Sequence, residues 1–276
     1  MNVPPWLPPG PALLFAPADR PERFGKAAGR ADGVIVDVED GAAAADPVAK
    51  RANVLAHPLD PARTILRVSG PDAPTFADDA RLAHESPYDV VMLPKVRDRI
   101  PEELAGLRVI AMIETPQAML AAGDIAAHPD VVGLFWGAED LAAELGGTSS
   151  RRTVAEDPAR SYRQPQQLAR TLTLVHAAAA GKVAIDAVHA DFRDEEGQYL
   201  EALDAAGAGF AATACIHPAM VPAVRRAYFP AEEELARARA ILARAGEHQG
   251  AFQLDGEMID APIVRQAALI ARRAGR

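Results

Sequence analysis

The chain has 276 residues, of which 49% are apolar and 24% are charged, values typical of one globular core. Its net charge of −9 argues against a surface built for nucleic acid, because phosphate binding needs clustered lysine and arginine. The single cysteine, Cys215, excludes an internal disulfide and fits a reducing compartment. The N-terminus is rich in proline rather than basic and apolar, and no window approaches the roughly 18 apolar residues of a membrane span. We therefore expect a soluble, cytoplasmic protein.

Short aliphatic runs, each followed by an alanine-rich segment with helical spacing, recur along most of the chain. The eight candidate strands are Leu13–Ala16, Gly33–Val38, Thr64–Val68, Val90–Pro94, Val109–Ile113, Val131–Trp136, Val183–Ala187 and Phe210–Ile216. Several are apolar throughout, as are strands buried on both faces of a parallel sheet. An open doubly wound sheet is the alternative, but no G-x-G-x-x-G follows the first strand. The predicted fold class is α/β, a (β/α)8 or TIM barrel formed by residues 1–220.

Two segments exceed what eight βα units need. The stretch Asp140–Lys182 is long and contains the polar run Gly146–Arg152, which is typical of an active-site loop. Residues 221–276 include a predicted helix at Ala231–Ala245 and a last helix after Asp260. We interpret residues 221–276 as a C-terminal helical extension that covers the barrel or reaches a neighbouring subunit.

Charged and polar residues follow most of the candidate strands, at the end of a barrel where catalytic residues lie. They are Asp37, Glu39, Asp40, Arg67, Lys95, Glu114, Glu139, Asp140, Asp186 and His217. So many carboxylates around one opening would repel one another unless a cation compensated them. A hard divalent ion such as Mg²⁺ prefers oxygen ligands and suits such a ring. No C-x2-C or H-E-x-x-H pattern is present, which argues against zinc.

Simpler explanations stay open for individual residues. Each acid taken singly is also explained as a solvated strand end or a helix cap. Ser149 and Ser150 lack the G-x-S-x-G elbow of a serine nucleophile, and Cys215 lies in an apolar strand that is expected in the core. His217 fits either ligand binding or a structural hydrogen bond. Lys95 fits a Schiff base only if it is desolvated, which nothing in the sequence indicates.

Nine segments, taken in order, resemble the citrate lyase beta subunit-like branch of the HpcH/HpaI aldolase superfamily. They are Phe15–Phe24, Val36–Gly41, Leu66–Val68, Met92–Lys95, Ile113–Pro116, Gly137–Leu141, Ala184–Asp186, Ile216–Pro218 and Gly256–Asp260. Each is short, but together they span nearly the whole chain and are highly specific.

The resemblance implies a Mg²⁺-dependent oxo-acid-lyase, with Mn²⁺ as an alternative metal. Such an enzyme cleaves a β-hydroxyacyl-CoA, of citramalyl-CoA or malyl-CoA type, to acetyl-CoA and pyruvate or glyoxylate, or runs the condensation in reverse. The metal ligands implied are Glu114 and Asp140, and the substrate-binding residues implied are Arg67, Glu114, Gly137 and Ala138. Arg20 and Lys26 lie where the family contacts the coenzyme A moiety.

Asp260 falls on an acidic residue that reaches the active site of the adjacent subunit in related malyl-CoA lyases. The resemblance therefore implies a homotrimer in which residues 221–276 act as a lid on a neighbour's site. In this scheme Asp260 protonates the enolate carbon during cleavage, and Arg67 stabilises the enolate oxygen. Asp37 and Glu39 would orient water around the metal.

The sequence departs from the family in two places. Ser69 and Gly70 follow Arg67 and Val68 where the family often has asparagine, and Phe210–Cys215 lacks the Gly-Lys that often precedes Ile-His-Pro. The alternatives to a stand-alone acyl-CoA lyase are a citrate lyase-type subunit acting on a carrier-protein thioester and a metal-dependent aldolase acting on free hydroxy-oxo acids. A barrel that binds without catalysis is disfavoured because both carboxylates and the arginine are present.

Overall fold

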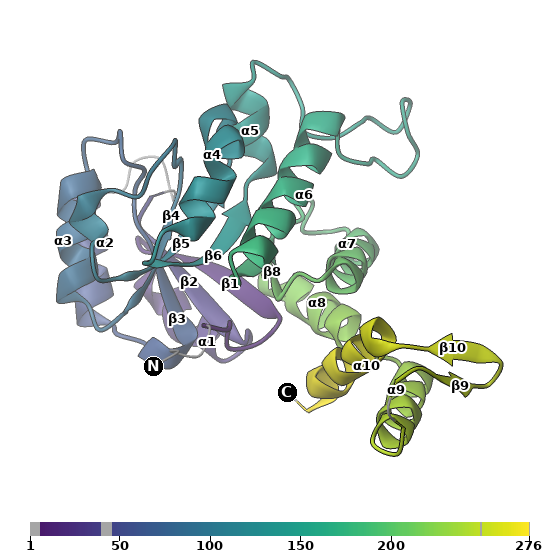
Figure 1. Cartoon of the computed structure of the whole chain (residues 1–276). Helices are drawn as coiled ribbons and strands as arrows, with labels where there is room; N and C mark the ends of the chain where they lie inside the picture. The colour runs from purple at the N-terminus through teal and green to yellow at the C-terminus, as the bar shows by residue number, and fades with distance from the viewer. Residues whose placement is uncertain (1–5, 40–45, 249, 276) are drawn as a thin grey trace. The chain divides into compact units, whose positions relative to one another are not determined.

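The computed structural model describes residues 6–39, 46–248 and 250–275, and its largest part is a closed barrel of eight parallel strands (Figure 1). The strands are β1 (Ala12–Pro17), β2 (Gly33–Asp37), β3 (Thr64–Arg67), β4 (Val90–Leu93), β5 (Arg108–Ile113), β6 (Val131–Trp136), β7 (Val183–Asp186) and β8 (Ala212–Cys215). Each strand pairs with its neighbour in the chain, and β8 closes on β1. The predicted barrel is confirmed, and the predicted strands differ from those found by at most two residues at either end. Asp40 lies outside the described residues.

Helices follow the strands and surround the barrel (Figure 1). They are α1 (Phe24–Ala28), α2 (Pro47–Ala56), α3 (Phe76–Glu85), α4 (Pro116–Ala127), α5 (Ala138–Glu144), α6 (Gln164–Ala179), α7 (Glu195–Ala208) and α8 (Val221–Tyr228). Side chains cap several of them: Asp46 accepts from the Val48 amide at the start of α2, and Thr115 accepts from the Ala118 amide at the start of α4. Caps of this kind fix where each helix leaves its loop.

The interior of the barrel is filled by side chains at alternate positions of the strands. Its core cluster contains Leu13, Ile35, Ile65, Met92, Ile110, Met112, Phe135, Ile185 and Ala212 among others. Because strand side chains alternate between faces, the residue two positions after an inward residue also points inward. This rule places Asp37, Arg67, Glu114 and Gly137 around the carboxyl-terminal opening, here called the mouth.

The connection between α5 and α6, residues 145–163, is a long arm held by its own backbone bonds. Arg151 pairs with Tyr162 in an antiparallel bridge, and the amide of Arg163 donates to the carbonyl of Ser150 at 2.9 Å. The predicted loop is thus confined to this arm, since α6 occupies most of the rest of Asp140–Lys182.

The chain divides into two compact units, Met1–Val224 and Arg225–Arg276. The second unit contains α9 (Glu232–Ala245), the hairpin of β9 (Phe252–Leu254) and β10 (Glu257–Ile259), and α10 (Ala261–Ala274). Its own small core includes Ala238, Ile241, Phe252, Leu254, Ile259 and Ala267. That these residues act on a neighbouring subunit stays a prediction. None of the helices in the described parts of the chain is long and apolar enough to cross a membrane.

Candidate active site

A cavity of about 320 Å³ opens at the mouth of the barrel, on the inward side of the strand ends. Its lining includes the predicted site residues Asp37, Arg67, Glu114, Gly137, Ala138 and Asp140. These six come from the ends of β2, β3, β5 and β6 and from the start of α5. The alternation of strand side chains therefore gathers in one place residues that lie up to about 100 positions apart in the chain.

Arg67 is held in a fixed orientation by two carboxylates. Its Nε and Nη2 donate to Oδ1 and Oδ2 of Asp37 at 2.8 and 2.7 Å, and its Nη1 lies 3.1 Å from Oε2 of Glu39. The register of the sheet pairs Asp37 directly with Arg67, which explains the two-pronged contact. Phe15 packs against the guanidinium, with the ring centre 4.8 Å from Cζ. This geometry gives the mouth a rigid, buried positive charge.

Asp37 and Glu39 lie on the same side of the chain, as alternation predicts. Their carboxylates contact Arg67 and Lys95, and Oδ1 of Asp37 also accepts from the amide of Glu39 at 3.1 Å, so both acids fix cations at the mouth. The role predicted for them, orientation of water around a metal, stays a prediction.

Glu114 is a buried acid of the mouth whose hydrogen-bonding capacity is only partly used. Its side chain is buried, Oε1 accepts from the amide of Lys95 at 2.7 Å, and Oε2 has no hydrogen-bond partner within the described structure. Burial, and after it the nearby charge of Asp140, raises the pKa of Glu114 to about 8. A buried carboxylate with an unused oxygen costs free energy unless a cation or a proton meets it.

Gly137 leaves the space into which Glu114 extends. A Cβ at this position would lie 2.2 Å from Oε2 and 2.9 Å from Cβ of Glu114. The register explains the closeness, because Ile113 pairs with Trp136 and the next residues of the two strands are Glu114 and Gly137. Any larger residue at 137 would displace the carboxylate.

Lys95 adds a second cation to the mouth. Its backbone has a φ of 52°, which turns its amide toward Glu114. Its ammonium lies 2.5 Å from Oε1 of Glu39 and 3.7 Å from Oδ1 of Asp140. Because two carboxylates stabilise the charged ammonium, this arrangement disfavours an amine nucleophile and hence the Schiff-base hypothesis.

The donor set at the mouth fits a hard divalent cation. The unused Oε2 of Glu114 and the half-exposed carboxylate of Asp140 are oxygen ligands on neighbouring elements. Outside the undescribed positions, the chain has no group of three or more His, Cys, Asp or Glu side chains arranged to hold a metal. Two carboxylates are what a Mg²⁺ site commonly uses, since this ion keeps several waters that substrate oxygens can replace.

Arg20 and Lys26 are exposed on the segment that leaves the carboxyl end of β1. Arg20 lies 3.7 Å from Asp19, and neither cation belongs to the lining of the mouth cavity. Their placement leaves both side chains accessible to an anionic ligand.

Asp260 lies in the C-terminal unit, between β10 and α10. Its side chain caps α10 by accepting from the amide of Ile263 at 3.4 Å. Its predicted action in another subunit's site remains a prediction.

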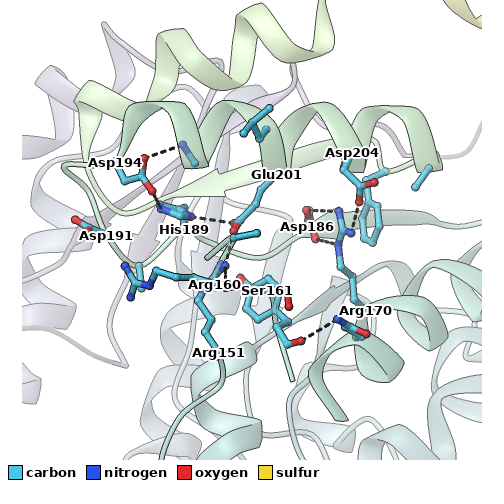
Figure 2. Close-up of a pocket in the computed structure, with 18 of the residues that line it drawn as sticks. Arg151, Arg160, Ser161, Arg170, Asp186, His189, Asp191, Asp194, Glu201 and Asp204 are labelled. Carbon is cyan, nitrogen blue, oxygen red and sulfur yellow. Dashed lines mark hydrogen bonds and ion pairs between the residues drawn. The ribbon is translucent and has the colours of Figure 1, made fainter. Parts of the chain in front are cut away.

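Asp186 does not belong to the ring of charges, and its expected place there is wrong. It ends β7 with its side chain on the outside of the barrel, where Arg170 of α6 binds it (Figure 2). Its neighbour Ile185 is the inward residue. His217 is exposed, and its Nδ1 accepts from the amide of Ala219, which is the structural role considered for it. Cys215 is buried, and burial raises the pKa of its thiol to about 12, so it is a core residue.

Two residues important for the mouth were not predicted. Lys50 of α2 is buried and donates to the carbonyl oxygens of Val38 and Glu39 at 3.3 and 3.4 Å. Asp79 of α3 accepts from the Ser69 hydroxyl at 2.6 Å, just after Arg67. Both fix backbone that carries site residues. A single sequence does not indicate that a lysine three positions after the start of a helix is buried. Ser69 was recognised as a polar residue after a strand, but its partner Asp79 was not predicted.

Comparison with known proteins identifies relatives that are similar over most of the chain. The family model of HpcH/HpaI aldolase/citrate lyase matches residues 12–218. A citrate lyase subunit beta-like protein of Mycobacterium tuberculosis is 46% identical over 267 residues, 96% of each chain. A (3S)-malyl-CoA thioesterase of Cereibacter sphaeroides is 33% identical over 264 residues, 90% of this chain and 89% of that protein.

A solved structure extends the similarity to three dimensions. The CitE protein of Mycobacterium tuberculosis in complex with magnesium, acetoacetate and coenzyme A has 46% sequence identity and a TM-score of 0.89, covering 97% of this chain and 98% of that chain. A match of this extent includes the barrel and the C-terminal unit alike. The chain belongs to the HpcH/HpaI aldolase/citrate lyase family.

Proposed function

We propose that the protein is a Mg²⁺-dependent lyase that cleaves a β-hydroxyacyl-CoA of citramalyl-CoA or malyl-CoA type into acetyl-CoA and an oxo acid. The observation that carries the proposal is the buried Glu114, whose Oε2 has no partner in the described structure and faces a mouth that also holds Asp140 and the fixed guanidinium of Arg67. The CitE relative bound to magnesium, an oxo acid and coenzyme A supports it.

Glu114 and Asp140 would hold the metal, which when bound polarises the oxo-acid carbonyl and stabilises the alkoxide of the hydroxy acid. Once the hydroxyl has released its proton to solvent, its oxygen forms the carbonyl of the oxo acid as the carbon–carbon bond breaks, and the electron pair of that bond passes to the thioester as an enolate. Arg67, fixed by Asp37 and Glu39, would stabilise the enolate oxygen without reorganising. Gly137 and Ala138 border the cavity where the oxo acid would lie.

The exposed Arg20 and Lys26 would bind the coenzyme A phosphates at the outer edge of the mouth. Anionic recognition is then local, although the chain as a whole has a net charge of −9. Charge reversal of both residues should raise the KM for a CoA thioester and leave the binding of a free oxo acid unchanged.

The test is an assay of purified protein with malyl-CoA and citramalyl-CoA, with and without Mg²⁺. Metal-dependent release of glyoxylate or pyruvate together with acetyl-CoA would support the lyase and identify its acyl group. Release of free CoA instead would indicate thioester hydrolysis, the activity named for the 33% identical relative. Activity confined to a carrier-protein thioester or to a free hydroxy-oxo acid would replace the proposal by one of the two alternatives.

We further propose that the enzyme is a homotrimer in which Asp260 supplies the proton for the enolate carbon in a neighbouring site. Asp260→Asn is a clean variant because asparagine also caps helices, so α10 keeps its cap while the acid is lost. Turnover should fall more than metal affinity. Mixed oligomers of Asp260→Asn and Glu114→Gln should regain activity, because some sites would then combine both native residues. Absence of recovery in proven mixed oligomers would place Asp260 in its own subunit's site or outside catalysis.

A further inference from the structure

The ion pair between the buried Asp186 and the half-buried Arg170 lies on the outside of the barrel (Figure 2). Arg170 donates through Nε and Nη2 to Oδ1 and Oδ2 of Asp186, both at 3.0 Å. The indole Nε1 of Trp136 donates to the same Oδ1 at 2.7 Å. Three charge-assisted bonds thus converge on one carboxylate that the proposed reaction does not use.

Trp136 links this pair to the mouth. It is the last residue of β6 and fully buried, and the next four residues are Gly137, Ala138, Glu139 and Asp140. It borders the mouth cavity, and its ring forms a T-shaped pair with Tyr162 of the arm, with ring centres 5.1 Å apart. The orientation of the indole therefore fixes where the backbone leaves β6.

The segment at the end of β7, residues 186–189, lies between two cavities. The outer cavity, about 710 Å³, is lined by Asp186 and His189, whereas Ala187 and Val188 between them line the mouth. A displacement of this short segment would change the shape of both cavities. At the mouth it would move Ala187 and Val188, which line the same cavity as Gly137 and Glu114.

We propose that Asp186 and Arg170 are positioning residues for the metal and oxo-acid site, acting through the indole of Trp136 on the turn from Gly137 to Asp140. The inference rests on the proposed function, since that function gives Gly137 and Asp140 their roles. Partners of this kind hold metal ligands in place and typically change metal affinity or activity about 10- to 100-fold when they are removed.

Trp136→Phe tests the link with least disturbance, because phenylalanine keeps an aromatic ring and leaves the two bonds of Arg170 intact. Asp186→Asn tests the pair itself. The control is Asp204→Asn, which removes a carboxylate that also binds Arg170, through Nη1 at 2.5 Å, but has no contact with Trp136. Each variant is compared with the wild type by calorimetric Mg²⁺ binding, kcat, KM and thermal melting.

We expect Trp136→Phe and Asp186→Asn to weaken Mg²⁺ binding roughly 10-fold and to lower kcat by a similar factor, while Asp204→Asn stays within twofold. If Asp186→Asn does not fold, the result for Trp136→Phe alone tests the positioning role. Unchanged Mg²⁺ affinity and kcat in folded Trp136→Phe would overturn the proposal and leave the pair a structural one. Wild-type protein that binds Mg²⁺ without lyase activity would refute the proposed function but not the positioning role, whereas absence of Mg²⁺ binding would refute both.

A spectroscopic readout distinguishes positioning from stability. The chain contains two tryptophans, so Trp6→Phe leaves Trp136 as the sole tryptophan, which can be excited selectively over the tyrosines. In that background, Mg²⁺ with pyruvate should change Trp136 emission, and Asp186→Asn should increase its quenching by acrylamide even well below the melting temperature. Identical quenching with and without Asp186 would contradict the proposed hold on the indole.

Discussion

The mouth and the outer cavity each contain a buried carboxylate at the end of a barrel strand, and the two carboxylates differ in the hydrogen bonds that they accept. Glu114 receives one hydrogen bond, from a backbone amide, and keeps one oxygen without a partner in the described structure. Asp186 receives bonds from both prongs of Arg170 and from the Trp136 indole. Burial raises the pKa of both acids, so desolvation alone does not separate them.

The two buried carboxylates therefore differ in unmet bonding capacity rather than in burial, and this difference is the reason for proposing the metal at Glu114. A buried ion pair with all its bonds made can hold structure, whereas a buried carboxylate beside a second acid requires a cation or a proton. Replacing a proposed metal ligand at the mouth should therefore remove activity with little loss of stability. Breaking the outer pair should also reduce stability.

The largest effect is expected from removing either proposed metal ligand. Glu114→Gln or Asp140→Asn should reduce Mg²⁺-dependent cleavage roughly 1,000-fold or more, because metal stabilisation of the alkoxide contributes several kcal/mol. Circular dichroism should remain native, and Glu114→Gln should melt no lower than the wild type since it removes an unsatisfied charge. Full activity of either variant in chelator-treated protein would show that the metal assignment is wrong.

Arg67→Lys should have the next largest effect. Lysine keeps the charge but cannot reproduce the two-pronged contact with Asp37, so the cation would no longer be fixed. We expect kcat to fall about 100-fold, the scale of one lost preorganised donor, with Mg²⁺ affinity within a few-fold of wild type. An equal loss of Mg²⁺ affinity would instead assign Arg67 to the metal site.

Much of the barrel follows from local pattern, because strands buried on both faces are short aliphatic runs that stand out between alanine-rich helices. The side on which a strand-end residue points is harder to predict. Val183–Asp186 is apolar on both faces until its last residue, so the sequence does not indicate which of its residues point into the barrel. For this reason Asp186 was wrongly predicted to lie at the mouth. The hairpin of the C-terminal unit was not predicted, although the sequence contains the Asp-Gly pair that is typical of a tight hairpin turn. Asp255 and Gly256, both with positive φ, form the turn that joins β9 to β10.

The residues of the candidate site were predicted through the resemblance to the family more than through their chemistry. Acids after strands are common, and only the fold shows that Glu114 keeps an unpaired oxygen while Glu139 accepts from the Ser150 hydroxyl at 2.5 Å. Lys50 is the opposite case. Its burial depends on carbonyl groups of Val38 and Glu39 that approach only in the folded barrel, so no local pattern could have indicated it.

An effect of intermediate size is expected when a glycine at the mouth is replaced, and a glycine in α7 provides the control. Gly137→Ala places a methyl group 2.2 Å from Oε2 of Glu114, so Mg²⁺ affinity should fall about 10-fold and stability by about 1–3 kcal/mol. Gly207→Ala in α7 meets no atom within 4 Å and should be neutral or stabilise by up to about 1 kcal/mol. Calorimetric Mg²⁺ titration and thermal melting measure both. Equal behaviour of the two variants would mean that the Glu114 carboxylate moves aside easily.

The smallest expected effect is a pH dependence of the metal-free protein. Burial raises the pKa of Glu114 from 4.5 to about 8, so between these values the folded chain retains a proton that the unfolded chain has lost. The stability contributed by the protonated group is therefore complete below pH 4.5 and is lost as the pH rises toward 8, by at most about 1.4 kcal/mol per pH unit.

Denaturant unfolding in chelator at several pH values should show this slope as the difference between wild type and Glu114→Gln, because glutamine does not titrate. Mg²⁺ should reduce the difference, because the cation binds the carboxylate form and replaces the proton. Asp186 should contribute less to such a slope than an unpaired acid at the same depth, because Arg170 and Trp136 stabilise its charged form. A parallel pH profile for wild type and Glu114→Gln would mean that water or a cation already satisfies Oε2 in the chelator-treated protein, and that the contrast between the two carboxylates is smaller than their contacts indicate.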